Sequence, residues 1–448
     1  MSRYKAYPSY KETRHSWLEN VPAHWKMLPL KFLTAQHVTD GPHETPEFID
    51  EGVPFLSVDG IQNNQLVFEG CRYISREDHA RYSIKCKPNQ GDVLLGKAAS
   101  VGKVAHVDTD IEFNVWSPLA VIRPRSEKTG RFIYYSLQSA LLQMQCDMYS
   151  NANTQKNLGM STIDNLAFAC PTDDEAEQVA SFLDHETAKI DALIEKQQRL
   201  IELLKEKRQA VISHAVTKGL NPNAPMKDSG VEWLGELPAH WQIKSLRYLG
   251  NCQNGINIGA EYFGSGYPFV SYGDVYRNDT LPIQVEGLVQ STHTDREIYS
   301  VRTGDILFTR TSETVDEIGF SAACLQTLEN ATFAGFLIRF RPNTTEVAVN
   351  FAKHYFRSTL MRSYFVQEMN LVTRASLSQD LLKRLPVPLP PENEQLEIAE
   401  YLDAKSRVFS KLTSNAETAI QLLKERRTAL ISAAVTGKID VRDWQATA

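Results

Sequence analysis

The segment Trp17–Trp25, "WLENVPAHW", has a near copy at Trp233–Trp241, "WLGELPAHW". Both copies keep the two tryptophans, the final "PAHW" and the length of the phrase. A repeat at a fixed period shows how many similar units a chain contains, and it has to be recognised before the domains are assigned. The two copies therefore predict a tandem repeat, with one unit in each half of the chain.

A second pair of matching segments closes each half. "PTDDEAEQVASFLD", Pro171–Asp184, aligns with "PPENEQLEIAEYLD", Pro390–Asp403, and the match continues as "LLKEKRQAVISHAVT" against "LLKERRTALISAAVT". Between these anchors, "PFLSVDG" aligns with "PFVSYGD" and "GDVLL" with "GDILF". Each half thus contains an opening phrase, a globular body and a closing helix.

The two bodies have the sequence pattern of mixed α and β structure. Short runs such as "DVLLG", "VAHV", "LAVIRP" and "FLIRF" are β-branched or aromatic and are bounded by turn residues, so they predict strands. "GRFIYYSLQSALLQMQ" and "VNFAKHYFRSTLMRSYFV" place apolar residues at helical spacing and predict helices.

The closing segments predict two long helices that pair with each other. Residues 174–217 would span about 65 Å as one helix, and each segment carries an apolar seam that requires a partner. Two repeats related by a pseudo-two-fold axis would bring the helices together antiparallel; packing of each helix on its own body is the alternative. The seam residues are Leu183, Ile190, Leu193, Ile194, Ile201, Leu204 and Val211, and then Leu402, Phe409, Leu412, Ala416, Ala419, Leu423 and Leu430.

These observations predict an α+β protein in four parts. They are a globular body at residues 1–170, a helix at 171–220, a second body at 221–389 and a second helix at 390–448. The chain has 448 residues, 42% hydrophobic and 23% charged, as expected for a globular protein of two or three domains. A net charge of −6 is not that of a generic polyanion binder, but it is compatible with a local basic groove.

Targeting and redox signals are weak. No apolar run is long enough to cross a membrane, and the N-terminal segment has no apolar signal core. The six cysteines are far apart and form no CxxC pair, so we expect free thiols in a reducing cytoplasm, without a disulfide framework or a metal site.

Several of these segments together resemble the specificity subunit of type I restriction–modification systems. They are "YKETRHSWLENVPAHW", "MKDSGVEWLGELPAHW", "DGPHETPEF", "GVPFLSVDGI", "GDVLL" and "PPENEQLEIAEYLD", and the resemblance covers nearly the whole chain. It implies a non-enzymatic reader of double-stranded DNA. Each body would be a target recognition domain for one half of a split, asymmetric sequence, and the helices would form a coiled coil between the two domains.

The same resemblance implies partner subunits that carry the chemistry. Two methyltransferase subunits would bind the helices, and restriction endonuclease/ATPase subunits would join them. S-adenosylmethionine, ATP and magnesium would be bound by those partners, and this chain would hold no cofactor. Its own motifs agree: it lacks the "NPP[YF]" motif of amino-methyltransferases, and "GKAASVGKV" has Val104 where a P-loop needs Ser or Thr for magnesium. We therefore predict no catalytic, cofactor-binding or metal-binding residue.

Candidate DNA-binding residues follow from positions that differ between the aligned halves. Base edges are read by Arg or Lys at guanine and by Asn or Gln at adenine, while phosphate contacts fix the register. Cations stand after "GDVLL" and "GDILF", and the loops "NANTQKNL" and "NLVTRASL" exchange a Gln for an Arg. Polar loops without a ligand are the alternative. The predicted residues are Lys97, Ser100, Lys103, Asn151, Gln155, Lys156, Arg310, Thr311, Ser312, Asn370 and Arg374.

The tryptophans of the repeated phrase have two possible roles. Trp17, Trp25, Trp233 and Trp241 either attach the connector to the start of each body or contact a methyltransferase subunit, because aromatic side chains concentrate binding energy at interfaces. Three other functions remain open. They are a helical scaffold that never touches DNA, a nuclease built on Asp, Glu and His, and the recognition subunit of a related system with fused nuclease and methyltransferase partners.

Overall fold

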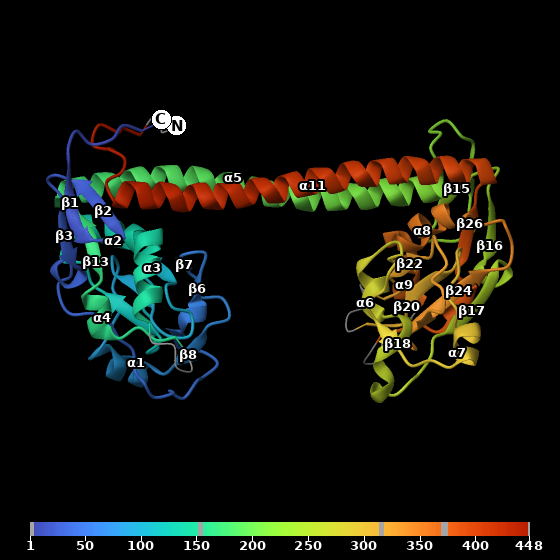
Figure 1. Ribbon diagram of the computed structural model, residues 1–448, viewed down its shortest axis with the longest axis horizontal. Coiled ribbons are helices and arrows are strands. Elements are labelled where there is room, and N and C mark those ends of the chain that lie inside the picture. The colour runs from blue at the N-terminus through green and yellow to red at the C-terminus, as the bar shows by residue number, and fades with distance from the viewer. Residues whose placement is uncertain (1–3, 151–155, 313–317, 369–374, 447–448) are drawn as a thin grey trace. The chain divides into compact units, whose positions relative to one another are not determined.

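The chain folds into two compact units, each built from one body and part of two long helices (Figure 1). The computed structural model describes residues 4–150, 156–312, 318–368 and 375–446. The N-terminal unit comprises residues 1–198 and 417–448, and the C-terminal unit comprises residues 199–416. Helix α5 (Asp173–Lys218) and helix α11 (Glu392–Val435) each contribute one part to each unit.

The two long helices run antiparallel within each unit. In the N-terminal unit, Phe182 near the start of α5 shares a core with Ile431 near the end of α11, and Arg427 Nε donates to Asp191 Oδ1 at 3.0 Å. In the C-terminal unit the end of α5 meets the start of α11, since a methyl group on Gly219 would lie 2.9 Å from Glu394 Oε1. The predicted pairing of the helices is confirmed.

The seam between the helices differs in detail from the predicted one. Leu193 and Leu412 are 45% and 44% exposed, although both were assigned to it. The more buried positions step instead from Ile190 to Ile194 in α5 and from Phe409 to Ala416 in α11. An α-helix has 3.6 residues per turn, so an apolar stripe drifts around its surface, and positions at the edge of the stripe become exposed.

The body of the N-terminal unit holds an antiparallel sheet in the order β10-β9-β12-β4 and a smaller sheet in the order β11-β5-β8. Strand pairs and helices complete it. The strands are β1 (Tyr10–His15), β2 (Leu18–Pro22), β3 (Lys26–Pro29), β4 (Thr39–Asp40), β5 (Val53–Leu56), β6 (Ile61–Gln62), β7 (Gln65–Leu66), β8 (Arg72–Ile74), β9 (Val93–Gly96), β10 (Val104–His106), β11 (Asn114–Val115), β12 (Leu119–Ile122) and β13 (Ala167–Cys170). The helices are α1 (Arg76–Ser83), α2 (Glu127–Gln138), α3 (Ala140–Tyr149) and α4 (Met160–Asp164).

The body of the C-terminal unit repeats this topology, with sheets in the orders β17-β24-β20-β22 and β19-β18-β23. Its strands are β14 (Met226–Asp228), β15 (Glu236–Pro238), β16 (Gln242–Ser245), β17 (Gly250–Asn254), β18 (Phe263–Val270), β19 (Leu288–Val289), β20 (Ile306–Thr309), β21 (Thr311–Ser312), β22 (Ser321–Ala323), β23 (Thr332–Phe333), β24 (Leu337–Pro342), β25 (Ala375–Ser376) and β26 (Pro386–Leu389). Its helices are α6 (Tyr272–Arg277), α7 (His293–Ile298), α8 (Val349–Arg357), α9 (Thr359–Glu368) and α10 (Gln379–Arg384). The same strand order in both bodies confirms the tandem repeat.

Each predicted body helix is divided in two at a buried serine. Ser139 separates α2 from α3, and Ser358 separates α8 from α9. Both serines are 0% exposed, and each hydroxyl donates to the carbonyl three residues earlier. Ser139 also accepts from the backbone N–H of Leu142 and so caps the next helix. The matching breaks align the two helix pairs residue by residue, with Gln138 opposite Arg357.

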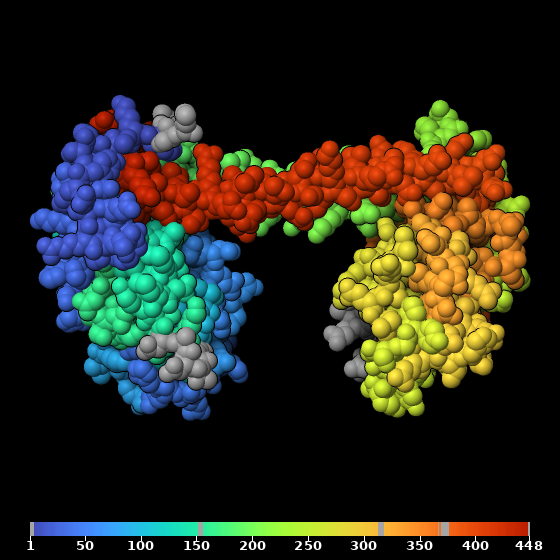
Figure 2. All heavy atoms as spheres, in the orientation of Figure 1, coloured from blue at the N-terminus to red at the C-terminus, as the bar shows by residue number. Residues whose placement is uncertain are grey.

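In the space-filling view, the long helices form one edge of each unit and the body lies against them (Figure 2). Among the described residues, no helix is both long and apolar enough to cross a membrane. The six cysteines are free, and burial raises the pKa of Cys146, Cys170 and Cys252 to about 12. The prediction of free thiols is confirmed.

Candidate nucleic-acid interface

The repeated "PAHW" phrase holds the first turn of each long helix. In the N-terminal unit, Trp25 Nε1 donates to Glu175 Oε1 at 3.1 Å, and His24 Nε2 lies 2.7 Å from Glu175 Oε2. Tyr7 adds a third contact, because its hydroxyl donates to Glu175 Oε1 at 2.7 Å. Burial and the adjacent Glu175 carboxylate raise the pKa of Tyr7 far above its usual value. A carboxylate in the first helical turn also interacts favourably with the helix dipole.

The C-terminal unit repeats this clamp with other residue numbers. Trp241 Nε1 donates to Glu394 Oε2 at 3.0 Å, and His240 Nε2 lies 2.8 Å from the same oxygen. Trp25 and Trp241 are both 0% exposed, so their indoles lie inside the protein. Trp17 and Trp233 are half-buried; Trp17 stacks on His15, and Trp233 packs at a tilt against Tyr364. These two tryptophans therefore retain exposed surface that a partner could contact.

The predicted cation at the exit of strand β9 lies in an internal ion pair. Lys97 is 7% exposed, and its Nζ lies 3.2 Å from Asp40 Oδ2. Lys85 Nζ and His43 Nε2 approach the same carboxylate at 2.6 and 3.3 Å. Burial alone would raise the pKa of Asp40, but the hydrogen bonds and charges of Lys85 and Lys97 outweigh burial and lower that pKa. The ammonium of Lys97 is therefore paired inside the protein with a carboxylate that it shares with Lys85.

The equivalent cation in the C-terminal unit has a different environment. Arg310 is half-buried and follows strand β20 as Lys97 follows β9. Asn254 occupies the position in its sheet that Asp40 occupies in the other unit. Each of the two residues precedes a glycine; Asn254 pairs with the second residue of β24, and Asp40 pairs with the second residue of β12. Asn254 carries no charge, so Arg310 has no carboxylate at the position equivalent to Asp40. Within the described residues, this difference makes Arg310 the better suited of the two to an external anion.

The structure brings the two predicted loops of each body together. In the N-terminal unit the backbone of Leu158 donates to Lys97 O at 2.8 Å, and in the C-terminal unit that of Leu377 donates to Arg310 O at 2.7 Å. The loop that follows the strand therefore lies beside the end of the "NANTQKNL" or "NLVTRASL" segment. Asn151, Gln155, Asn370 and Arg374 themselves lie outside the described residues.

The remaining predicted residues lie around these two exits. Lys156 is exposed, and its Nζ lies 2.9 Å from Asp147 Oδ1. Ser100 and Lys103 are half-buried in the turn between β9 and β10, where Lys103 Nζ donates to Val58 O at 3.4 Å. Thr311 is half-buried, and β21, which it forms with Ser312, pairs with β25. In both bodies, the described members of the predicted set lie on neighbouring segments at one exit.

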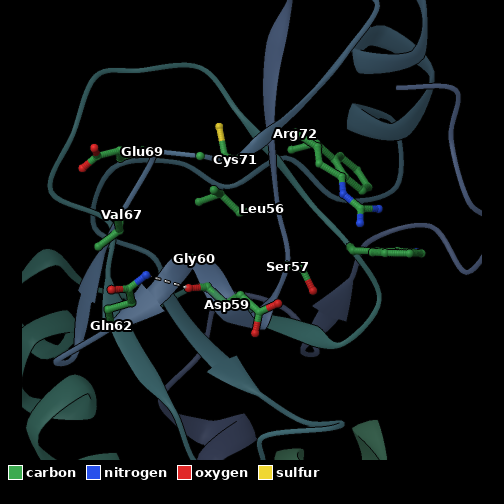
Figure 3. Close-up of a pocket in the computed structure, with 12 residues that line it drawn as sticks. Leu56, Ser57, Asp59, Gly60, Gln62, Val67, Glu69, Cys71 and Arg72 are labelled. Carbon is green, nitrogen blue, oxygen red and sulfur yellow. Dashed lines mark hydrogen bonds between the residues drawn. The ribbon is translucent and has the colours of Figure 1, made fainter. Parts of the chain in front are cut away.

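Sequence reasoning missed aromatic side chains beside these exits. Phe336 is 62% exposed, and its carbonyl accepts from the backbone of Arg310 at 2.9 Å. In the N-terminal unit, Trp116 helps to line a cavity of about 280 Å³, together with polar side chains that include Asp59, Gln62 and Arg72 (Figure 3). A comparison of the aligned strands could have identified Phe336, because an aromatic residue at the exposed end of a strand is a candidate for base stacking.

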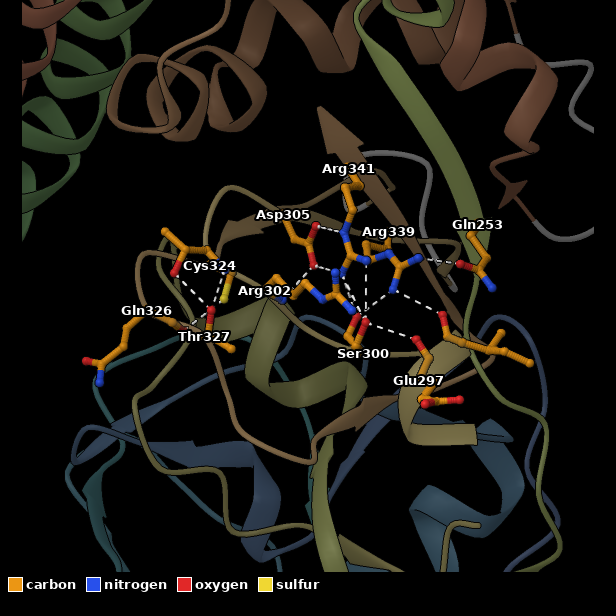
Figure 4. A network of polar contacts seen from close by, with 12 residues as sticks. Gln253, Glu297, Ser300, Arg302, Asp305, Cys324, Gln326, Thr327, Arg339 and Arg341 are labelled. Carbon is orange, nitrogen blue, oxygen red and sulfur yellow. Dashed lines mark hydrogen bonds and ion pairs between the residues drawn. The ribbon is translucent and has the colours of Figure 1, made fainter. Parts of the chain in front are cut away.

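An arginine network stabilises the sheet of each body. Arg341 binds Asp305 through Nε and Nη2, both at 2.6 Å (Figure 4). In the other body, Arg123 binds Asp92 in the same way at 3.0 and 2.8 Å. The neighbouring Arg339 is 6% exposed, and burial lowers its pKa to about 10. Arg339 pairs with Leu307 across the sheet, as Val121 pairs with Leu94 in the other body, so this buried cation occurs in one repeat and not in the other.

The described residues contain no group of three or more His, Cys, Asp or Glu placed to hold a metal ion. Two repeated α+β bodies, each fixed to a pair of long helices and each with polar and cationic residues at a strand exit, define a protein with two recognition heads. The model of the type I restriction modification DNA specificity domain matches residues 43–204 and 238–422, and the chain belongs to this family.

Named relatives cover most of the chain. The type I restriction enzyme StySPI specificity subunit of Salmonella potsdam is 22% identical, over 95% of this chain and 91% of its own length. The putative type I restriction enzyme MjaX specificity subunit of Methanocaldococcus jannaschii is 23% identical, over 97% of this chain and 98% of its own length.

Solved structures share the fold. A chain of a type I restriction–modification system, studied for its assembly and conformational transition, matches with a TM-score of 0.64 and 16% identity, covering 94% of this chain and 99% of that one. The HsdS subunit of Thermoanaerobacter tengcongensis matches with a TM-score of 0.53 and 15% identity, covering 94% and 98%. At these identities the likeness establishes the fold alone.

Proposed function

We propose that this chain is the DNA-recognition subunit of a type I restriction–modification complex, and that each body reads one half of a split, asymmetric target. The observation that carries the proposal is the duplicated strand exit, at the end of β9 beside Lys97 and at the end of β20 beside Arg310. The two bodies share one scaffold, but they present different side chains at this exit. Two unlike heads on equivalent scaffolds are suited to reading two unlike half-sites, because base edges are distinguished by the side chains that reach them.

Within this proposal the C-terminal exit makes the stronger phosphate or guanine contact. Arg310 has no carboxylate at the position equivalent to Asp40, and the exposed ring of Phe336 lies next to it. Lys156 and the residues outside the described ranges, Gln155 and Arg374, would complete the two reading surfaces. An Arg suits guanine and a Gln suits adenine, so the two heads would prefer different bases.

The long helices would set the gap between the half-sites and carry the partners. Helix α5 runs through 46 residues, and its two parts belong to different units. We propose that two methyltransferase subunits dock on the helical pairs, with Trp17 and Trp233 beside them, and that restriction endonuclease/ATPase subunits join this assembly. S-adenosylmethionine, ATP and magnesium would then be bound by those partners in the cytoplasm, and this chain would supply recognition without catalysis.

Exchange of one body tests whether each body reads its own half of the target. Residues 34–168 are replaced by the corresponding body of another family member, and the chimaera is expressed with its partner subunits. Base-resolved mapping of adenine methylation in the host DNA should then show one altered half-site and one unaltered half-site. A target that changes in both halves, or that consists of one uninterrupted word, would contradict the proposal.

Helix length provides a second test with a different readout. Insertion of one turn into both α5 and α11 adds about 6 Å, which corresponds to about one to two base pairs of duplex. We expect a longer gap with both half-sites unchanged. The alternative of a scaffold that never touches DNA predicts no duplex binding by this chain, whereas binding through phosphate contacts weakens steeply as salt rises.

A further inference from the structure

A basic cavity lies in the C-terminal unit, between the second part of α5 and the body. Its volume is about 320 Å³, and its lining includes Arg208 of α5, Arg277 of α6 and the pair Arg357 and Arg362 of α8 and α9. The carboxylate in the described lining is Asp279. Lys353 also lines the cavity, but its Nζ lies 2.7 Å from Asp403 Oδ1, which neutralises it.

Two of the guanidinium groups share one aromatic ring. Arg357 and Arg362 lie 4.6 and 4.8 Å from the ring centroid of Phe320, which also lines the cavity. Arg357 is fixed in place, because its Nη1 donates to the carbonyls of Asn278 and Ser321 at 2.9 and 2.8 Å, and its Nη2 donates to another carbonyl of α6. Arg357 therefore serves the structure and contributes positive charge to the cavity.

The other repeat shows that this charge is not needed for the fold. The aligned breaks at Ser139 and Ser358 place Gln138 opposite Arg357 and Gln143 opposite Arg362. The separate alignment of "PFLSVDG" with "PFVSYGD" places Asn63 opposite Arg277, the last residue of α6. Neutral side chains thus form this region in the N-terminal unit at three positions where the C-terminal unit has arginines.

Arg208 has lost the partners of its counterpart, Arg427. Arg427 Nε donates to Asp191 Oδ1 at 3.0 Å, and its Nη1 donates to Gln138 Oε1 at 3.1 Å. The positions that correspond to Asp191 and Gln138 are occupied by Ser410 and by another cation. Arg208 Nε is buried without a hydrogen-bond partner among the described residues.

Asp279 Oδ2 lies 3.9 Å from Arg208 Nη2, which makes a long ion pair. Burial lowers the pKa of Arg357 to about 10; Asp279 opposes this shift, whereas the charges of Arg362 and Arg208 add to it. The cations of the cavity therefore repel one another, and a bound anion would relieve this repulsion.

We propose that this cavity, whose described lining does not include Arg310, is a phosphate-binding site held by Arg208, Arg277 and Arg362. Guanidinium groups bind phosphate oxygens through paired N–H donors, and several of them around one cavity match the charge of a phosphate group better than that of a carboxylate. The phosphate belongs either to the backbone of duplex DNA or to a free phosphate-bearing molecule, and the second source does not require DNA recognition by this chain.

The test uses the full-length chain and replaces arginines by the residues of the other repeat. Arg277→Asn and the double variant Arg277→Asn/Arg362→Gln remove charges from the cavity while leaving Arg357 in place. Lys207→Gln is the matched control, because Lys207 is an exposed cation next to Arg208 and does not line the cavity. Thermal melting checks that each variant folds, and the exposed Arg277 provides a single variant with little structural risk.

Two binding measurements separate the sources. Calorimetry with inorganic pyrophosphate should show binding to the wild type and at least about tenfold weaker binding to the double variant. Fluorescence anisotropy with duplex DNA over a range of salt should show a slope of log K against log salt that falls by about 1 to 2, since each phosphate contact contributes about 0.9.

Each outcome either supports the phosphate-binding proposal and identifies the source of the phosphate, or overturns the proposal. A reduced DNA slope identifies the DNA backbone as the source, whether or not pyrophosphate binds. Weaker pyrophosphate binding with an unchanged slope identifies a free phosphate-bearing molecule, and that arm stands even if the chain binds no DNA. The proposal is overturned if neither measurement changes in the double variant, or if Lys207→Gln changes both as much as the double variant does.

Discussion

Removal of the Glu175 carboxylate tests whether the repeated "PAHW" phrase stabilises the start of α5. In Glu175→Ala, Trp25 Nε1 and the Tyr7 hydroxyl lose a buried charged acceptor, and His24 loses its ion pair. A hydrogen bond to a charged group contributes about 1.5–3 kcal/mol, and a donor left buried without a partner adds a desolvation cost. With two buried donors, we expect a loss of about 3–5 kcal/mol of unfolding free energy.

Glu394→Ala provides an internal comparison. Glu394 receives Trp241 and the half-exposed His240, and its side chain is 23% exposed against 7% for Glu175. One buried donor in place of two predicts a smaller loss, of about 1.5–3 kcal/mol. Glu195→Ala, on the exposed surface of α5, is the matched control for Glu175→Ala and should stay within about 0.5 kcal/mol of the wild type.

Urea unfolding followed by tryptophan fluorescence measures these losses, and hydrogen exchange at residues 173–182 localises the first one. A double-mutant cycle with Tyr7→Phe adds a sharper criterion. Tyr7→Phe should destabilise the wild type by about 1–2 kcal/mol and should have almost no effect in Glu175→Ala, because the acceptor of the hydroxyl is already gone. If Glu175→Ala costs no more than Glu195→Ala, the clamp does not hold the helix and the reasoning is refuted.

Three other predictions concern charge, pH and close packing. Arg310→Ala should weaken duplex binding and lower the salt slope by about 1, whereas Lys97→Ala should mainly lower the melting temperature because its ammonium is paired internally; anisotropy and thermal melting compare the two. Burial lowers the pKa of His106, so below about pH 6.5 the unfolded chain takes up a proton that the folded chain does not. Stability should therefore fall as the pH drops through this range, and His106→Gln should flatten that part of a plot of the urea midpoint against pH. Gly41→Ala and Gly255→Ala should each lower the melting temperature of their own unit, since an added Cβ would lie 1.7 and 2.1 Å from a carbonyl oxygen.

The repeat made the architecture predictable from sequence, because local patterns determine local structure. The runs around Val93 and Leu119 form strands, and α5 (Asp173–Lys218) lies within the segment 171–220 that was predicted as the first long helix. The break at Ser139 was missed because the apolar spacing continues through it, and only the buried hydroxyl contacts reveal the turn. Periodicity records which face of a segment is apolar, and it says little about where a helix is interrupted.

The neutralisation of charges was not predictable, because it depends on contacts between residues distant in sequence. Lys97 and Arg310 occupy equivalent positions in the alignment, and their difference appears only when strand pairing shows that Asp40, which contacts Lys97, is replaced by Asn254 in the C-terminal unit. The same holds for Arg208, whose missing partner became visible only through the ion pair of its counterpart. A single sequence gives the positions of the cations but not which of them are already paired.

The two units share one scaffold but differ in how their cations are paired. The clamps at Glu175 and Glu394 and the sheet ion pairs are duplicated, so the scaffold is the same in both units. Within the described residues, Arg310 and Arg208 have no carboxylates at the positions equivalent to Asp40 and Asp191, which pair with Lys97 and Arg427. Cations with less compensation raise the local potential, and contacts to phosphate make binding salt-dependent.

The C-terminal head should therefore contribute the larger share of the salt dependence of DNA binding. Neutralising Arg310 in the full chain should flatten the salt slope more than neutralising Lys156, the exposed cation of the N-terminal exit, whose Nζ is already paired with Asp147. Equal slopes for the two variants would show that the pairing seen in the free protein is exchanged for phosphate when DNA binds, and that the two heads are electrostatically equivalent in the complex.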